Sequence, residues 1–352
     1  MLVRLHVRDF RNLDEVDLEL GPGASLFWGE NAQGKTNLLE AVYYLSSARS
    51  FRSASGGELV KEGAPSFEIA GDLQPEGDRL RAAFHLDQGG TWEWNGNRLD
   101  RAVDFAGRLP AVVFHSGDLR LARGRPADRI RWLDHSIAQR EPPFLKSLAR
   151  FQRALRMRNA ALKDARSNAE LDALDETFVG LARAITSKRS QYWPALQGAV
   201  RNAYAEICAR VEEVTADFAS GVSENFDEIL KASLAADRAA GATQLGSHRD
   251  RIELRFGNLD AGAVASEGQA RSLALAFKIA QVRFLRSELG RDPLLLLDDV
   301  WGELDASRRS ALETLVAASP QVLATATDAG RTNLKGWTAA WKVKAGRITP
   351  AA

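Results

Sequence analysis

The sequence predicts an α/β fold that carries an inserted helical subdomain, and three patterns in its 352 residues lead to this expectation. Apolar and charged residues alternate with period two at 2–7, 16–20 and 67–99, as they do in half-buried strands. A short apolar strand at 25–28 runs into a glycine-rich loop and then into helical spacing at 37–45. The middle third of the chain changes to a helical period, and the last third returns to sheet.

The remaining elements of the first two thirds follow in order. Asn95-Gly96 predicts a tight hairpin, because both residues accept the positive φ that a two-residue turn needs. Another short strand is expected at 111–114. Beyond Pro143 the apolar spacing predicts three or more helices that pack on one another. Changes of register near Ser167 and Pro194 predict separate short helices instead of one long coiled coil.

In the last third, the sheet resumes at Ile252, a helix is expected over 269–285, and buried strands are expected at 294–297 and 322–326. These elements divide the chain into three predicted parts. They are the N-terminal part of a head at 1–118, a helical arm at 119–240 and the C-terminal part of the head at 241–352.

Composition narrows the class of protein. Hydrophobic residues make up 45% and charged residues 26%, as in an ordinary globular protein, and no apolar run approaches the roughly 20 residues of a bilayer span. Residues 1–6 alternate instead of forming an apolar signal segment, so secretion is not expected. The single Cys208 excludes an intrachain disulfide and suits a reducing cytoplasm. We therefore expect a cytoplasmic protein with no membrane partner.

Charge is balanced overall and uneven locally. The formal net charge is +1, but the stretch 120–166 holds thirteen Lys or Arg against four acids. A nucleic acid would bind such a local patch through its phosphates. The alternative is a solvated helical surface, because Arg150, Arg153, Arg156 and Arg158 spread round their predicted helix.

A phosphate-binding loop is the most specific motif. Residues 29–36, GENAQGKT, fit G-x-x-x-x-G-K-[ST] between a predicted strand and a predicted helix. Glycine lets backbone amides wrap phosphates, Lys35 neutralises the outer phosphates and Thr36 offers an oxygen to Mg²⁺. A chance glycine turn is the alternative, and the strand and helix that flank the loop disfavour it.

Two further motifs fit the same chemistry. The buried strand 294–297 ends in Asp298, expected to hold Mg²⁺, and Asp299, placed to orient or deprotonate the attacking water. Ser266, followed by Gly268 and Gln269, begins a helix whose N-terminus can bind an anion. Taken alone, the first pattern is a common strand end and the second a capped helix; the loop at Lys35 favours the functional interpretation of both.

Together these segments resemble an ABC-type ATPase head. The loop at Lys35, the 266–269 tetrapeptide, the Asp298-Asp299 strand end and Glu303-Leu304-Asp305 match its Walker A, signature, Walker B and D-loop elements in order and spacing. More narrowly, the chain resembles the RecF family of bacterial DNA-repair proteins along nearly its whole length. The matching stretches are Phe10-Arg11-Asn12-Leu13, residues 29–41 (GENAQGKTNLLEA), Arg49-Ser50-Phe51-Arg52, Gly124-x-Pro126-x-x-Arg129 with Leu133-Asp134, His248-Arg249-Asp250 and residues 294–305 (LLLLDDVWGELD).

The resemblance implies a P-loop ABC-type ATPase head with an N-terminal mixed or antiparallel sheet and an inserted helical subdomain. It implies ATP and Mg²⁺ as cofactors, slow DNA-dependent ATP hydrolysis and a homodimer that forms with ATP. The implied target is gapped DNA with single-strand to duplex junctions, and the implied partners are RecR, with RecO and RecA in the same pathway of recombinational repair.

Residue roles follow from the motifs and the resemblance. Lys35, Asp298 and Asp299 are the predicted catalytic residues, and Thr36 and Asp298 the predicted metal ligands. The predicted nucleotide contacts are Gly29, Glu30, Asn31, Ala32, Gln33, Gly34, Lys35, Thr36, Asn37, Arg11, Asn12, Ser266, Gly268, Gln269 and Asp305. The predicted DNA contacts are Arg120, Arg123, Arg125, Arg129 and Arg131. In the expected dimer, ATP on Lys35 of one subunit is capped by residues 266–269 of the other.

Some residues depart from the family pattern. Ile130 stands where paired arginines are usual, Ser247 where a proline is usual, and Thr325 and Thr327 where many ABC ATPases carry a histidine. The segment around His115 also differs, so no nucleotide-sensing role is assigned to it, and the alternative is a packing or surface histidine.

Other P-loop proteins fit less well. A chromosome-organising SMC head needs hundreds of coiled-coil residues between its motifs, whereas 263 positions separate Lys35 from Asp298. A GTPase needs an Asn-Lys-x-Asp motif, which the sequence lacks, and a kinase does not need residues 266–269. An ABC transporter subunit fits the motifs, but the Phe10-Arg11-Asn12 pattern and the helical insertion argue against it.

Overall fold

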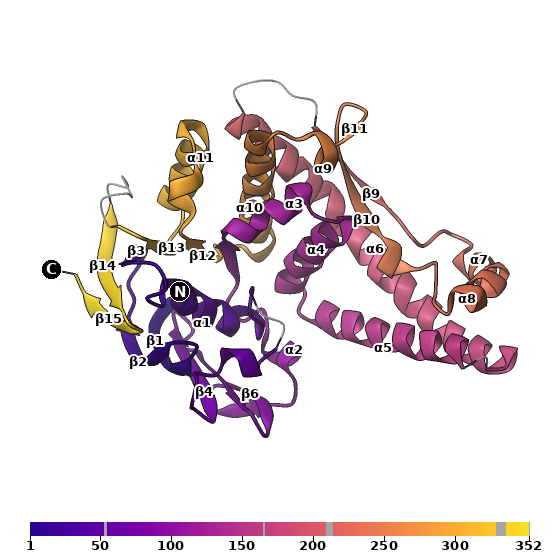
Figure 1. The fold of residues 1–352 in the computed structure, drawn as a ribbon, viewed down its shortest axis with the longest axis horizontal. Coiled ribbons are helices and arrows are strands. Elements are labelled where there is room, and N and C mark those ends of the chain that lie inside the picture. Colours follow the sequence, from indigo (N-terminus) through magenta and orange to yellow (C-terminus); the bar gives the residue numbers. More distant parts are fainter. Residues whose placement is uncertain (53–54, 165, 209–213, 329–335, 352) are drawn as a thin grey trace.

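Both ends of the chain build one sheet in the computed structural model, which describes residues 1–52, 55–164, 166–208, 214–328 and 336–351 (Figure 1). Its strand order is β15-β14-β3-β13-β12-β8. The strands β14, β3, β13, β12 and β8 run parallel to their neighbours, and β15 is antiparallel to β14. Their bounds are β3 Gly23–Trp28, β8 Ala111–Phe114, β12 Leu294–Asp298, β13 Gln321–Ala326, β14 Trp337–Lys344 and β15 Arg347–Pro350.

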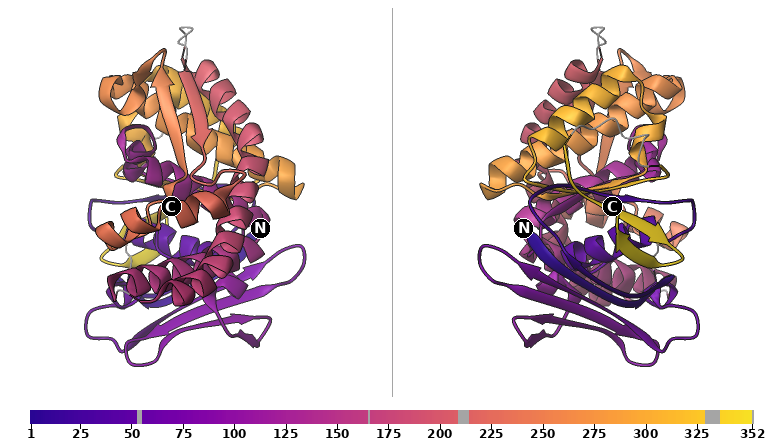
Figure 2. Two further views of the ribbon diagram at one scale, coloured as in Figure 1. Left: turned by 90° about the vertical axis from the view of Figure 1, so that its right-hand side faces the viewer. Right: turned by 90° about the vertical axis from the view of Figure 1, so that its left-hand side faces the viewer.

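A second sheet of six strands is antiparallel throughout, with the order β2-β1-β4-β5-β6-β7. Figure 2 shows it as an outer layer at the bottom of both views, opposite the helical elements. The predicted hairpin is confirmed, since Asn95 (φ 52°) and Gly96 (φ 76°) form the turn between β6 and β7. The bounds are β1 Leu2–Phe10, β2 Leu13–Glu19, β4 Ser66–Leu73, β5 Arg79–His85, β6 Gly89–Trp94 and β7 Asn97–Leu99.

Helix α1 (Lys35–Ser47) lies between these two sheets. It contacts β1, β4 and β5 of the antiparallel sheet and β8, β12 and β13 of the parallel one. Leu38, Leu39, Val42 and Leu45 are buried in one apolar core with residues of both sheets. Burial on both sides fixes α1, and therefore fixes the loop that precedes it.

The helical insertion contains α3 to α8, and its two long helices α5 (Pro143–Lys163) and α6 (Asn168–Ile207) pack side by side (Figure 1). The predicted boundary near Ser167 is confirmed, because the Ser167 side chain caps α6. The predicted break at Pro194 is wrong. Pro194 lies on the exposed face of α6, while Trp193, Leu196 and Val200 are buried; tertiary packing outweighs the lost helical hydrogen bond.

The remaining elements are shorter and are distributed along the chain. They are α2 Ala102–Phe105, α3 Arg120–Arg123, α4 Pro126–Arg140, β9 Val214–Ala219, α7 Phe226–Ala232, α8 Leu234–Ala240, β10 Arg251–Phe256, β11 Leu259–Asp260 and α9 Ala261–Val264, with single 3-10 turns η1 Gly57–Leu59, η2 Ser116–Leu119, η3 Ser247–Arg249 and η4 Val300–Glu303. Strands β9, β10 and β11 form a small third sheet.

Helix α10 (Glu267–Leu289) joins the insertion to the parallel sheet, since it packs on α6, α3 and α4 as well as on β8. Helix α11 (Ala306–Ala317) follows β12. Among the described residues, no helix is both long and apolar enough to cross a bilayer.

Candidate functional site

Two of the predicted motifs, the loop at Lys35 and the strand end at Asp298, meet at one edge of the parallel sheet. The loop 29–34 follows β3, Asp299 follows β12, and His115 follows β8, while Thr325 lies near the end of β13. Because neighbouring strands are parallel, their carboxyl ends lie at the same edge. This edge is where ligands bind in open α/β sheets.

The loop 29–34 has a backbone that few side chains could accept. Gly29 (φ 159°) and Gly34 (φ 112°) lie in or near the glycine region, and Ala32 has φ 62°. A Cβ on residue 29 would lie 2.2 Å from the Val343 carbonyl oxygen, and one on residue 34 would lie 2.8 Å from Asn12 Oδ1. Gly34 begins α1 without a side-chain cap, so the first amides of the helix are left to bind an anion.

Lys35 is buried at the centre of this loop. Its Nζ donates hydrogen bonds of 2.7 Å to the carbonyl oxygens of Gly29 and Glu30. Burial lowers the pKa of Lys35, and the nearby carboxylates of Asp299 and Asp298 partly oppose this shift. The ammonium group is therefore held inside the curl of the loop, and an anion there would relieve its desolvation.

Asp298 forms the polar centre of the site. Its Oδ1 accepts a hydrogen bond from Thr36 Oγ1 at 2.7 Å and another from Thr325 Oγ1 at 3.0 Å. The Asp299 amide in turn donates to Thr325 Oγ1 at 3.0 Å, and Asp299 has φ 52°. The predicted pair Thr36 and Asp298 is thus adjacent, and Thr325 joins it although its role was left open by the sequence.

A magnesium ion fits this donor set. Thr36 and Asp298 offer a hydroxyl and a carboxylate oxygen within hydrogen-bond distance of each other, the hard ligands that Mg²⁺ prefers. The described residues contain no group of three or more His, Cys, Asp or Glu able to hold a metal by themselves. The ion would therefore take its other ligands from phosphate oxygens and water.

The turn between β1 and β2 braces the loop from behind. Asn12 accepts a hydrogen bond from Asn37 at 2.8 Å and donates to the Ala32 carbonyl at 3.4 Å. The Arg11 guanidinium binds the buried Glu40 carboxylate, with Nη2 to Oε1 at 2.9 Å. Asn12 thus contacts the loop directly, whereas these bonds tie Arg11 to the middle of α1. Direct nucleotide contact by either residue stays a prediction.

The turn between β14 and β15 holds Gln33, another of the predicted nucleotide contacts. The Ala345 amide donates to Gln33 Oε1 at 2.7 Å, and the Gly346 amide donates to the Gln33 carbonyl at 2.9 Å. Gln33 Nε2 also lies 3.4 Å from the Asn31 carbonyl. Gln33 is therefore occupied by the β14–β15 turn, a contact that local sequence could not indicate.

Ser266 begins α10 as predicted. Its Oγ accepts the Gln269 amide at 3.2 Å, and Gln269 Oε1 accepts the Ser266 amide at 2.8 Å, a reciprocal capping box. This end of α10 lies beside α9, away from the loop that precedes α1 (Figure 1). A single chain thus brings Lys35, Thr36 and Asp298 together but does not bring Ser266 to them.

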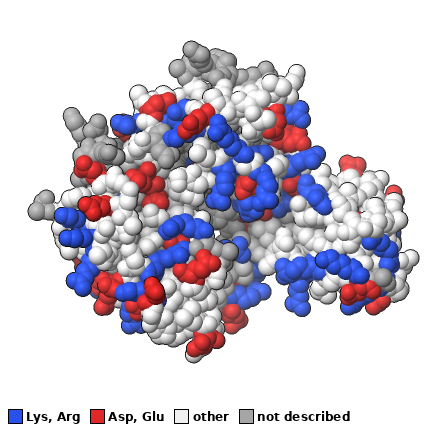
Figure 3. All heavy atoms as spheres, viewed as in Figure 1, with Lys and Arg blue, Asp and Glu red and all other residues white. Residues whose placement is uncertain are grey.

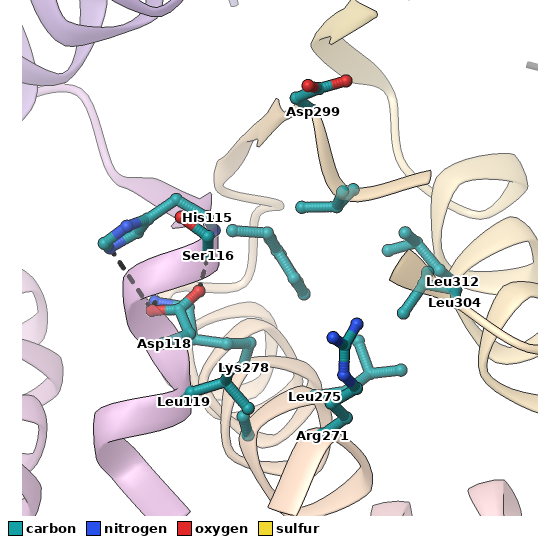
Figure 4. A pocket seen from close by; sticks show the side chains of 13 residues that line it. His115, Ser116, Asp118, Leu119, Arg271, Leu275, Lys278, Asp299, Leu304 and Leu312 are labelled. Atoms are coloured by element: carbon teal, nitrogen blue, oxygen red, sulfur yellow. Dashed lines mark hydrogen bonds and ion pairs between the residues drawn. The ribbon is translucent and has the colours of Figure 1, made fainter. Parts of the chain in front are cut away.

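A cavity beyond Asp299 contains two residues that sequence analysis missed, Asp118 and Lys278 (Figure 4). Lys278 projects from the buried face of α10, and its Nζ lies 3.8 Å from Asp118 Oδ1. Burial lowers the pKa of Lys278. A lysine in the middle of an apolar helix face was the available signal.

His115 lies in the same cavity and has a local structural role. Its Nδ1 accepts the Gly117 amide at 3.2 Å, while the His115 amide donates to Asp118 Oδ2 at 2.9 Å. Burial lowers the pKa of His115, and Asp118 partly opposes the shift. The alternative of a packing histidine agrees with these contacts.

The basic stretch 120–166 separates into surface and interior residues. Arg120, Arg125 and Arg131 are exposed, and Arg123 is exposed but donates to the Ala265 carbonyl beside Ser266 at 3.0 Å. Figure 3 shows Lys and Arg over the α3–α4 region and along the arm that carries α5. Arg129 is 3% exposed, and its Nε donates to the Ile252 carbonyl at 2.7 Å. Its predicted DNA contact is therefore wrong, because burial removes its guanidinium from the surface.

Arg158 is also interior. It is fully buried and binds Asp175, Asp237 and Thr243 at 2.6, 2.6 and 2.9 Å. Counting Lys and Arg along 120–166 therefore overstates the positive charge on the surface of this stretch.

Comparison with known proteins places this geometry in a family. The family model described as RecF/RecN/SMC N terminal domain matches residues 1–336. The chain is 38% identical over 345 residues to the DNA replication and repair protein RecF of Anaeromyxobacter dehalogenans (strain 2CP-C), covering 93% of this chain and 92% of that protein. It is 33% identical to the RecF of Salinibacter ruber, covering 94% of this chain and 85% of that protein.

Solved structures agree with this comparison. The structure of the recombination mediator protein RecF with ATP in the RecFOR pathway matches with a TM-score of 0.92 and 27% identity, over 100% of this chain and 97% of that one. An Smc head domain from Pyrococcus yayanosii matches with a TM-score of 0.57 and 15% identity, over 100% and 97%, which shows a shared fold. The chain therefore belongs to the RecF family of DNA replication and repair proteins and has the ATPase head fold of that family.

Proposed function

We propose that ATP joins two copies of this chain and that the joined form binds DNA. The observation that carries the proposal is the split of the motifs: Lys35, Thr36 and Asp298 bond within one site, while Ser266 begins a helix end that faces away from it. A twofold dimer places the Ser266 turn of each copy over the triphosphate held by the other. ATP binding then supplies association energy that its hydrolysis removes.

In this proposal each side chain of the site has a defined task. The loop amides 29–34 and Lys35 bind the phosphates, and Thr36 and Asp298 hold Mg²⁺. Bound Mg²⁺ neutralises charge on the phosphate oxygens. Asp299 lies next to Asp298 and borders the cavity that His115 and Lys278 also line, which supports the proposal that it orients the attacking water. Thr325, which bonds both to Asp298 and to the Asp299 amide, links the metal ligand to this residue.

DNA is proposed to lie on the exposed arginines of α3, α4 and α5, bound mainly through phosphates. Two matched proteins carry names that connect them with DNA repair and with the RecFOR pathway, which supports the same process for this chain. We propose that it recognises gapped DNA at single-strand to duplex junctions and, with RecR and RecO, helps RecA to load. It would act in the cytoplasm, with DNA stimulating slow ATP hydrolysis.

The test is binding to gapped, duplex and single-stranded DNA of equal length, each with and without ATP, over a series of salt concentrations. We expect gapped DNA with ATP to bind most tightly. Replacing Arg125 and Arg131 together by alanine should lower the slope of log affinity against log salt by about 2, because each lost phosphate contact removes about one unit.

Arg4→Ala is the matched control, since Arg4 is equally exposed on the antiparallel sheet and pairs with Asp17. An unchanged salt slope in the double variant would show that DNA does not bind this surface. Equal affinity for all three DNAs, with and without ATP, would contradict the proposed function.

A further inference from the structure

Arg308 lies in the first turn of α11, and its side chain is mostly buried. The side chain is 13% exposed. It makes three hydrogen bonds: Nη2 to the Gly268 carbonyl at 2.6 Å, Nε to Ser272 Oγ at 2.9 Å and Nη1 to Asp305 Oδ2 at 2.8 Å. The first two partners belong to α10 and the third to the turn that begins α11. One side chain thus ties together two helix starts that are about forty residues apart in the sequence.

The Arg308 guanidinium packs closely against α10. A Cβ at residue 268 would lie 2.9 Å from Arg308 Nη2, so glycine leaves the room that the guanidinium occupies. Ser272 is 3% exposed, one turn further along the same helix. The planar fork of arginine satisfies all three acceptors at once, whereas lysine would present a single ammonium group to them.

The proposed dimer directs the Ser266 turn toward the partner's nucleotide, and Asp305, in the other joined turn, is itself a predicted nucleotide contact. Ser266 and Gly268 belong to the capping turn of α10, and Asp305 caps α11. Lys35 bonds to the carbonyl oxygens of its own loop, and Thr36 bonds to Asp298. Arg308 bonds to neither group and joins the two turns instead. A change at Arg308 should therefore alter the surface that meets the partner and leave the ATP site of its own subunit intact.

We propose that Arg308 is a positioning residue that holds the Ser266 turn and the Asp305 turn as one rigid unit, so that both reach the nucleotide of a second copy together. This inference rests on the proposed ATP-dependent dimer and names the residue that prepares its capping surface. If the two turns move independently, each must be ordered when the dimer closes, and this ordering reduces the affinity.

The direct test is Arg308→Ala, studied by two measurements on the full chain. The first is the affinity of the monomer for a fluorescent ATP analogue, measured at a protein concentration too low for two copies to associate. The second is the protein concentration for half-association at saturating ATP, from sedimentation. We expect analogue affinity within about twofold of wild type, and a half-association concentration raised by roughly tenfold or more, since the bonds from a charged donor to three acceptors are lost.

The fold should survive this change. Asp305 Oδ1 still accepts the residue-308 amide at 3.0 Å, a bond that any side chain at 308 keeps, so α11 retains its cap. Arg308→Lys keeps the charge without the fork and should fall between wild type and alanine. Ser272→Ala removes one acceptor only and gives a second, milder variant whose association should weaken in the same direction.

Arg283→Ala is the matched control. Arg283 projects from α10, is 39% exposed and pairs with Glu206 at 2.6 Å, remote from the start of α10. Its loss should leave both measurements unchanged.

The outcomes separate this inference from the proposed function. A wild-type chain that stays monomeric at saturating ATP overturns both. A wild type and an Arg308→Ala variant that associate equally overturn the role of Arg308 alone. Equal weakening of analogue binding and association in Arg308→Ala also contradicts it, because that pattern marks general loss of structure.

Discussion

His135 is a partly buried side chain that bonds to Tyr43 of α1. Its Nε2 lies 3.1 Å from the Tyr43 hydroxyl and 3.0 Å from Gln139 Nε2. Burial, with the positive charges of Lys278 and Arg49, lowers the pKa of His135 to about 4 from a usual 6.5. The folded chain therefore binds this proton more weakly than the unfolded chain does.

The free energy of unfolding should consequently fall with acid. The contribution of neutral His135 is fully present above pH 6.5 and is lost as the pH falls toward 4, by on the order of 3 kcal/mol in total. We expect His135→Asn to remove this part of the pH dependence in urea titrations between pH 7 and pH 4. Identical slopes for variant and wild type would show that His135 does not titrate in this range.

At the residue scale, the sequence motifs predicted those side chains whose positions a motif fixes. The strand, loop and helix around residues 29–36 position Lys35 and Thr36, and Asp298 meets Thr36 because β12 ends at the same edge of the parallel sheet. Asp118 and Lys278 could not be predicted, since their pairing depends on how α10 packs against η2. The predicted DNA contact of Arg129 failed for the same reason, because only the tertiary fold buries this side chain.

At the scale of elements, the β14–β15 turn supports the phosphate loop. Ala345 and Gly346 bond to Gln33, and a Cβ at residue 346 would lie 2.0 Å from the Asn12 carbonyl oxygen. Gly346→Val should push the turn off the loop and weaken ATP binding by roughly tenfold, the cost of about one or two hydrogen bonds.

Gly290→Val is the control for this prediction. Gly290 has a similar positive φ of 63°, against 76° for Gly346, but a Cβ there meets nothing within 4 Å. Calorimetry measures the ATP affinity of both variants. An equal loss of affinity in the two would show that backbone strain, and not the contact with Gln33, causes the loss.

The buried Arg158 holds the helices of the arm together. It joins α5 to Asp175 of α6 and to Asp237 of α8. Arg158→Met would leave two buried carboxylates without their cation, so we expect a loss of about 3–5 kcal/mol in the free energy of unfolding. Arg156→Met, on the exposed face of α5, should change it by less than about 0.5 kcal/mol.

Urea denaturation followed by circular dichroism measures this difference. Similar midpoints for the two variants would mean that the ion cluster contributes nothing net. Sequence periodicity located α5 and the start of α6, but it placed a break at Pro194, since it could not register the packing of α6 on α10.

At the scale of the whole molecule, the head is assembled from both ends of the chain, with β3 between β13 and β14. The order of motifs along the sequence predicted this arrangement, because parallel strands at one sheet must collect Lys35 and Asp298. The sequence could not show how far the Ser266 turn lies from Lys35, which is set by the length and direction of α10.

In the proposed dimer, each ATP is held by the loop of one copy and capped by the Ser266 turn of the other. The most direct test is to mix two defective chains, Lys35→Met, which keeps its Ser266 turn, and Ser266→Arg, which keeps its loop. Sedimentation should show each variant monomeric with ATP, whereas the mixture should form a heterodimer that contains one intact site. ATP-dependent association of either variant alone, to the extent seen for wild type, would contradict the account.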